Sequence, residues 1–425
     1  MTTVTLPTLL VLLALLSLAK AIGSGGWSVS CFRATALARM DPIQSVGKIS
    51  AHSHIIVGSN GFSMDMKNED ALNAECTTCD VTVDRSNYWI PQLYNRNRTI
   101  QQRATNLTLF SNSRNGTYTA LRSGARPLYR TDPLQFEFAP SIYYKFNTSH
   151  YCPGSCAKIR AFPPGFRMVA GNPAFSRAGQ AAPETIQYKC VGNPQIGHLS
   201  FDDWSFYKKY KCPGGLRVEI TFPQCWDGRN LKPVLVTLKN GKKAWYSHTR
   251  YSKGTTCPST HPQKIMQVFY EFLFYTDDFW VGDQHPDLIW STGDTTGFGL
   301  HGDFFSGWDV GVVSSLLRQF FNLSVHLTFF TTRQQLQEAI DTCDFTANHP
   351  YLGIYSCKPL AKHLVFNPSN TEYQSLLAMA KLQSCNIKAK VPNETVIGTI
   401  PRLLGTASKQ DTRPRNLRLR GYEGV

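Results

Sequence analysis

The sequence has little acidic charge and only one long apolar run. Its 425 residues include 44 Lys and Arg against 29 Asp and Glu, which gives a formal net charge of +15. The apolar run, Leu6–Leu18, has the length of a signal-peptide core and is too short to span a bilayer. A small-x-small cleavage pattern follows at Ala19–Ala21. We therefore expect residues 1–21 to be a signal peptide, the mature chain to be secreted, and no membrane span to be present.

The sequence also lacks the signatures of several common enzyme classes. It has no Gly-x-Ser-x-Gly elbow, no His-Glu-x-x-His helix and no P-loop. These absences remove the support for a serine hydrolase of that type, a zincin metalloprotease or a nucleotide-binding enzyme. The basic runs 96–130 and 402–420 do not interleave their charges with aromatic rings, which disfavours nucleic acid as a partner. They favour either solvated loops or attraction to an anionic surface such as an acidic polysaccharide.

Cysteines and glycosylation sequons agree with export. The twelve cysteines, an even number, suit an oxidising compartment and up to six disulfides. Six Asn-x-Ser/Thr sequons predict a glycoprotein: Asn97, Asn106, Asn115, Asn147, Asn322 and Asn393. Nine cysteines precede residue 309 and three follow it, so complete pairing requires at least one disulfide between the two regions. The C-terminal region is therefore expected to be stapled to the body.

Short alternating segments separated by Pro- and Gly-containing turns indicate a mainly β fold. Strands are expected at 48–57, 141–146, 216–222 and 268–275. We expect residues 22–310 to form a sandwich or jelly-roll-like body with long disulfide-stapled loops. Residues 311–400 are expected to be a short helical, Cys-containing extension, with helices beginning near Asp309 and Thr332. Residues 401–425, basic and poor in large apolar side chains, are expected to be disordered.

His52 and His54 are the most informative residues. In a strand, side chains two positions apart share a face, so both imidazoles project from one side while Ile55 and Val57 enter a core. His301 and Asp303 repeat this spacing. We predict that His52, His54, His301 and Asp303 share a polar cleft, where they act as catalytic groups or as ligands of a divalent metal such as Zn²⁺.

Eight stretches of the sequence carry a family resemblance. They begin at Arg39, Ser50, Asp84, Phe162, Phe222, Ser247, Cys257 and Leu300. In this order they resemble the fungal secreted family called domain of unknown function 1996, which often lies beside carbohydrate-binding WSC modules. The resemblance implies a secreted fungal protein with one family domain and no established reaction. The family usually reads Asp-His-Lys-Ser-His where this chain has Ala244–His248, so an acid and a histidine are missing there.

The candidates for substrate binding lie in or beside these stretches. They are Trp89, Tyr94, Trp226, Asp227, His248, His261 and Trp308. Aromatic rings near turns either pack a core or stack on sugar faces, and both interpretations stay open. The first functional hypothesis is an enzyme acting on extracellular or cell-wall glycan, as a metal-assisted hydrolase or a lyase. The alternatives are a non-catalytic glycan-binding wall protein and a basic secreted effector or antimicrobial protein.

Overall fold

The computed structural model describes most of the body and part of the C-terminal region. Its described residues are 24–97, 117–121, 127–129, 132–136, 140–147 and 159–308, with short gaps at 198, 238–242, 255, 277–278 and 281–284, and parts of 334–403. The expected signal peptide, the helix expected from Asp309 and residues beyond 403 lie outside them. Leu403 itself is buried beside Tyr94 and Ile289, so packed residues reach into the segment predicted to be disordered.

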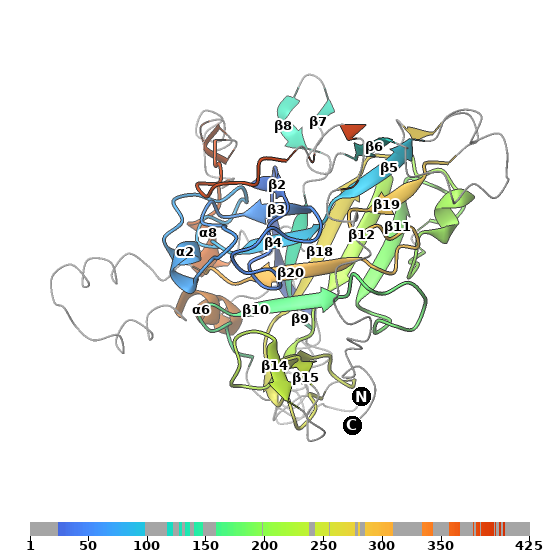
Figure 1. Ribbon diagram of the computed structural model, residues 1–425. Helices are drawn as coiled ribbons and strands as arrows, with labels where there is room; N and C mark the ends of the chain where they lie inside the picture. Colours follow the sequence, from blue (N-terminus) through green and yellow to red (C-terminus); the bar gives the residue numbers. More distant parts are fainter. Residues whose placement is uncertain are drawn as a thin grey trace, which may run out of the picture.

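Two five-stranded antiparallel sheets form the body (Figure 1). The first sheet contains, in spatial order, β1 (Ser24–Ser30), β9 (Ser141–Asn147), β18 (Gln267–Phe274), β12 (Gly215–Thr221) and β11 (Ile186–Val191). The second contains β10 (Arg167–Gly171), β20 (His301–Phe305), β4 (Asn87–Pro91), β3 (His54–Gly58) and β2 (Ala36–Ala38). The expectation of a mainly β, sandwich-like body is confirmed.

The main core lies between these two sheets. Alternate residues of each strand point inward, as the period of two requires. Tyr88 of β4 packs edge-on against Tyr270 of β18, with ring centroids 5.8 Å apart. Gly302 of β20 leaves room for Ile220 of β12, whose side chain would lie 3.0 Å from an added Cβ. Ile55 and Val57 belong to this core, as the alternation predicts.

Smaller sheets and a few short helices complete the described structure. A four-stranded sheet contains, in spatial order, β19 (Leu288–Trp290), β5 (Leu93–Asn97), β6 (Thr117–Ala120) and β21 (Thr399–Ile400). A three-stranded sheet contains β16 (Thr249–Arg250), β13 (Cys225–Trp226) and β17 (Gln263–Lys264). A third sheet pairs β14 (Val234–Thr237) with β15 (Lys243–Tyr246). The last sheet pairs β7 (Pro127–Tyr129) with β8 (Asp132–Phe136). The helices are α2 (Asn68–Leu72), η4 (Ser205–Lys208), α6 (Gln334–Thr342) and α8 (Lys358–Ala361). None of the helices in the described part is long and apolar enough to cross a membrane.

The disulfides include a bridge between the body and the C-terminal region. The described pairs are Cys31–Cys79, Cys76–Cys385, Cys190–Cys212 and Cys225–Cys257. Cys76–Cys385 joins residues 309 positions apart and is the kind of crossing bridge that cysteine parity requires. Disulfides of this number are typical of proteins from an oxidising compartment.

The expected strands are observed with one important difference. Strands β9, β12 and β18 begin and end within one residue of the predicted bounds. The strand predicted at 48–57 is shorter, because β3 begins only at His54. Residues 48–53 form bends and irregular backbone instead. The residues before them form turns, in which the Asp41 carboxylate accepts the backbone N–H groups of Ile43 and Gln44. Ile49, which a strand over 48–57 would place on the same face as Ile55 and Val57, is 51% exposed.

Candidate metal centre

The outer face of the second sheet carries three converging histidines. His54 begins β3 and His301 begins β20, and both strands pair with β4, which lies between them. His52 precedes β3 by two residues, and its ring centroid lies 4.3 Å from that of His54 and 5.0 Å from that of His301. One ligating nitrogen from each ring lies within 4.8 Å of the other two. All three side chains are buried.

Backbone carbonyls fix the orientation of two of the rings. The Nδ1–H of His54 donates to the Met40 carbonyl at 3.0 Å, and the Nδ1–H of His301 donates to the Gly299 carbonyl at 3.0 Å. A carbonyl oxygen only accepts, so in the neutral rings the lone pair lies on Nε2. The Nε2 atoms of His52 and His301 are 3.0 Å apart, and the buried Nε2 of His54 has no hydrogen-bond partner.

Hydrogen bonds to Ser53 anchor the segment between His52 and His54. The Ser53 carbonyl accepts the Gln92 backbone N–H at 3.0 Å and the Ser291 hydroxyl at 2.6 Å. The Ser53 hydroxyl lies 3.1 Å from the Tyr94 hydroxyl. These contacts hold both histidines in place although His52 lies outside the strand.

Asp294 organises the loop that orients His301. Its carboxylate accepts the backbone N–H groups of Thr296, Gly297 and Gly299 at 2.8–2.9 Å. Through Gly299 it therefore fixes the carbonyl to which the His301 ring donates. Sequence reasoning missed this residue, because an Asp within a Gly- and Thr-rich loop normally indicates only a turn.

Asp303 lies two residues after His301 on the same face of β20, opposite Trp89 of β4. It is not a member of the group of mutually close ligand atoms. The side chain is fully buried, and neither carboxylate oxygen has a hydrogen-bond partner at ordinary distance. Burial and the neighbouring Asp41 carboxyl raise the pKa of Asp303 well above its usual value. A buried carboxyl in this state favours a nearby cation.

Burial favours the neutral form of His54 and His301. Burial lowers the pKa of His301 to about 4, against a smaller opposing effect of its hydrogen bond to Gly299. Burial and the neighbouring His301 lower the pKa of His54 well below its usual value. Neutral imidazole is the form that ligates metals.

The three histidines fit a divalent transition metal. Bonds of 2.0–2.1 Å in a tetrahedral arrangement place ligand nitrogens about 3.3 Å apart. The observed 3.0 Å between two Nε2 atoms is close to that value. Metal-ligating histidines characteristically donate their other ring N–H to a carbonyl or carboxylate, as His54 and His301 do here.

A second group, Asp227, His248 and His261, gathers around β13, β16 and β17. The Asp227 backbone N–H donates to the His248 carbonyl at 2.9 Å, and His261 Nε2 lies 2.9 Å from the Ser247 carbonyl. The Asp227 carboxylate is already hydrogen-bonded to Arg229 and Asn230.

This second group is separate from the three-histidine centre. His248 packs on Phe166, next to the first residue of β10, whereas His301 pairs with Gly171 at the other end of that strand. Four residues of strand correspond to about 13 Å. The sequence candidates therefore fall into two places rather than one shared cleft.

The aromatic candidates are packed inside the protein. Trp89 and Tyr94 are 0% and 1% exposed, and Trp226 and Trp308 are 7% and 6% exposed. Trp89 contacts Phe62, and Trp308 packs edge-on against Tyr144. These rings serve the core and do not present the open flat faces that sugar stacking requires.

Comparison with known families gives one match. A family model described as Domain of unknown function (DUF1996) matches residues 41–308. The chain belongs to this family. Neither a curated protein nor a solved structure matches the chain itself. All three histidines, Asp303 and the second group lie within the matched range, whereas Cys385 and the residues after it lie beyond it.

Proposed function

We propose that this chain is a secreted metal-binding protein whose three-histidine centre holds a divalent transition-metal ion. The observation that carries the proposal is the convergence of His52, His54 and His301, with two rings oriented by backbone carbonyls. Three neutral nitrogen ligands suit Zn²⁺ or a similar borderline ion.

The arrangement has the ligand number of a catalytic rather than a structural zinc site. Catalytic sites use three protein ligands and leave a fourth position for water or substrate, where the metal acidifies the bound water and polarises carbonyls. Asp303 is a buried carboxyl on the same face that would carry negative charge once a cation is bound nearby. The carbonyls of Met40 and Gly299 fix the orientations of the His54 and His301 rings.

Action on extracellular glycan, as a metal-assisted hydrolase or lyase, is the weaker extension of this proposal. It rests on the family resemblance and the basic charge. The burial of the three histidines counts against direct access for a polymer. Binding to wall material without catalysis, and a role as a basic effector, would depend on the arginine runs instead, of which Arg96 is already paired with Asp287 at 2.6 Å.

Elemental analysis of the purified protein, after incubation with Zn²⁺ and removal of free ion, tests the proposal. We expect about one zinc per chain and a loss of at least 100-fold in affinity for His52→Ala, His54→Ala or His301→Ala, since each removes one of three ligands. His285→Ala is the matched control, because its ring donates to Pro286 outside the group. Zinc retained by all three ligand variants would contradict the proposal.

Gly171→Ala should weaken zinc binding without touching a ligand. Gly171 has φ +78°, and an added Cβ would lie 2.3 Å from the Leu300 carbonyl and 3.2 Å from the His301 Cβ. The substitution must therefore shift the start of β20. Gly179→Ala is the control, because Gly179 has nearly the same φ, +77°, with no atom within 4 Å. Equal zinc affinities for the two variants would show that the position of His301 is insensitive to this contact.

A further inference from the structure

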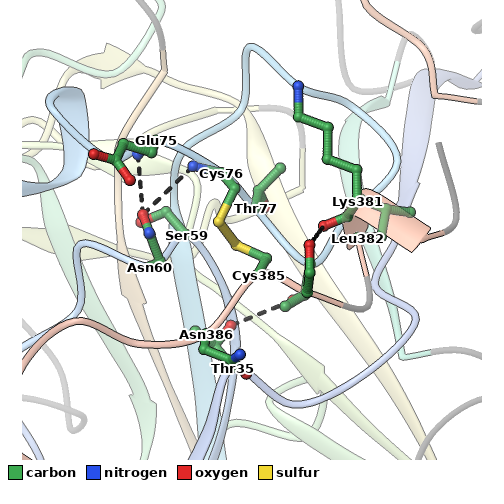
Figure 2. Close-up of a disulfide and its surroundings, with 12 residues drawn as sticks. Thr35, Ser59, Asn60, Glu75, Cys76, Thr77, Lys381, Leu382, Cys385 and Asn386 are labelled. Carbon is green, nitrogen blue, oxygen red and sulfur yellow. Dashed lines mark hydrogen bonds between the residues drawn. A yellow bond between two sulfur atoms is a disulfide. The ribbon is translucent and has the colours of Figure 1, made fainter. Parts of the chain in front are cut away.

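The C-terminal segment returns to the body beside the metal centre. The Cys76–Cys385 disulfide fixes its beginning (Figure 2), and the Arg33 guanidinium donates to the Leu382 and Cys385 carbonyls. Near its far end, β21 pairs with β6. We refer to residues 385–396 as the strap. It follows the family-matched range by more than seventy residues of chain.

The strap is linked through Arg39 and Tyr94 to the two ends of the segment that carries His52. On one side, Arg39 donates to the Ser50 carbonyl at 2.6 Å and pairs with Glu394 of the strap at 3.0 Å. On the other side, the Tyr94 hydroxyl donates to the Val396 carbonyl at 2.8 Å and lies 3.1 Å from the Ser53 hydroxyl. One residue therefore links the strap to each flank of His52.

Apolar contacts place the middle of the strap over the same face. Ile387 and Val391 pack on the small core formed on the outer side of the second sheet, which includes Met40 and Trp89. Met40 supplies the carbonyl that orients His54. The strap thus covers the side of the sheet that carries the centre.

We propose that the strap restricts the metal centre to small ligands, such as water or azide-sized anions, and that its release admits larger ones. This inference rests on the proposed metal function. His52 is 7% exposed and the other two histidines are fully buried, so the slightly exposed ring of the centre lies on the segment that the strap holds. The strap depends on one disulfide, the Arg39–Glu394 pair, an exposed Lys388–Glu75 pair and a few other contacts, which makes it easier to displace than the sheets.

Metal exchange in Co²⁺-loaded full-length protein tests the inference. Azide should change the Co²⁺ absorption spectrum of the wild type, whereas 1,10-phenanthroline should remove the ion slowly. In the double variant Cys76→Ser with Cys385→Ser, removal should be about tenfold faster or more, since each 1.4 kcal/mol lost from the closed state raises the open population tenfold. The double variant Cys190→Ser with Cys212→Ser is the disulfide control, because that bridge lies at the β11–β12 end.

A second variant keeps the test valid if the cysteine variant does not fold. Glu394→Gln removes the strap's ion pair with Arg39 and should also accelerate removal of the ion. Lys388→Gln is its matched control, because the Lys388–Glu75 pair on the same strap is 54% and 70% exposed and contributes little. Equal removal rates in the wild type and both strap variants would overturn the inference alone. Failure of the wild type to hold Co²⁺ would overturn the proposed function.

Discussion

Saturating the protein with Zn²⁺ should raise its free energy of unfolding by about 4 kcal/mol at a free-ion concentration 1,000 times the Kd. A ligand that binds only the folded state stabilises it by mass action. Here the folded state alone brings the ligands together, since His52 and His301 are 249 residues apart in sequence. Urea unfolding, followed by tryptophan fluorescence in zinc-buffered and chelator-treated solutions, measures the difference.

The ligand variants separate this effect from non-specific ion binding. In His301→Ala the zinc-dependent gain at the same free-ion concentration should fall to about 1.4 kcal/mol or less, whereas His285→Ala should keep it. The chelator-treated wild type and His285→Ala should unfold alike. A zinc-dependent gain of the same size in His301→Ala would place the ion elsewhere on the protein.

Acidification from pH 7 to pH 4 should destabilise the wild type relative to His248→Leu by about 3 kcal/mol. Burial lowers the pKa of His248 to about 4 from its usual 6.5. Between pH 6.5 and pH 4, His248 is therefore protonated in the unfolded chain and neutral in the folded chain. The contribution of His248 to stability is therefore complete above pH 6.5 and is lost as the pH falls toward 4.

The comparison between variants is essential, because buried carboxyls act in the opposite sense. Burial raises the pKa of Asp84, so its cost to the folded state is relieved as the pH falls. Phe166→Leu is the packing control, since it removes the ring that contacts His248 but no titrating group. Chemical unfolding at pH 7, 5.5 and 4 gives the free energy of unfolding of the three proteins as a function of pH. Parallel pH profiles for the wild type and His248→Leu would refute the assignment.

Periodicity in the sequence predicted that His52, His54 and His301 lie close together, although Asp303, predicted with them, is not in the group. The i, i+2 spacing placed His301 and Asp303 on one face of β20, and alternation placed Ile55 and Val57 in the main core. The same reasoning gave the wrong structure for residues 48–53, because the pairings of β3 with β2 and with β4 both end at His54. His52 still reaches the centre because Ser53 is anchored to Gln92 and Ser291.

Features that depend on tertiary contact could not be predicted from the sequence. The role of Asp294 comes from three backbone N–H groups that only its own loop conformation directs at it. The burial of Trp226 and Trp308 depends on packing with Phe166 and Tyr144, residues distant in sequence. Cysteine parity required a crossing bridge but did not identify Cys76 and Cys385 as its partners.

The strand order of the second sheet would make the proposed metal binding a measure of completed folding. Strand β20 inserts between β4 and β10, so residues near 301 must join a sheet whose other strands come from the first 171 residues of the chain. Pairing over such sequence separations is slow, because loop closure precedes the contacts that stabilise it. A nascent chain that ends before β20 has two of the three histidines and no site. The rate of ion uptake during refolding would therefore report when β20 joins the sheet.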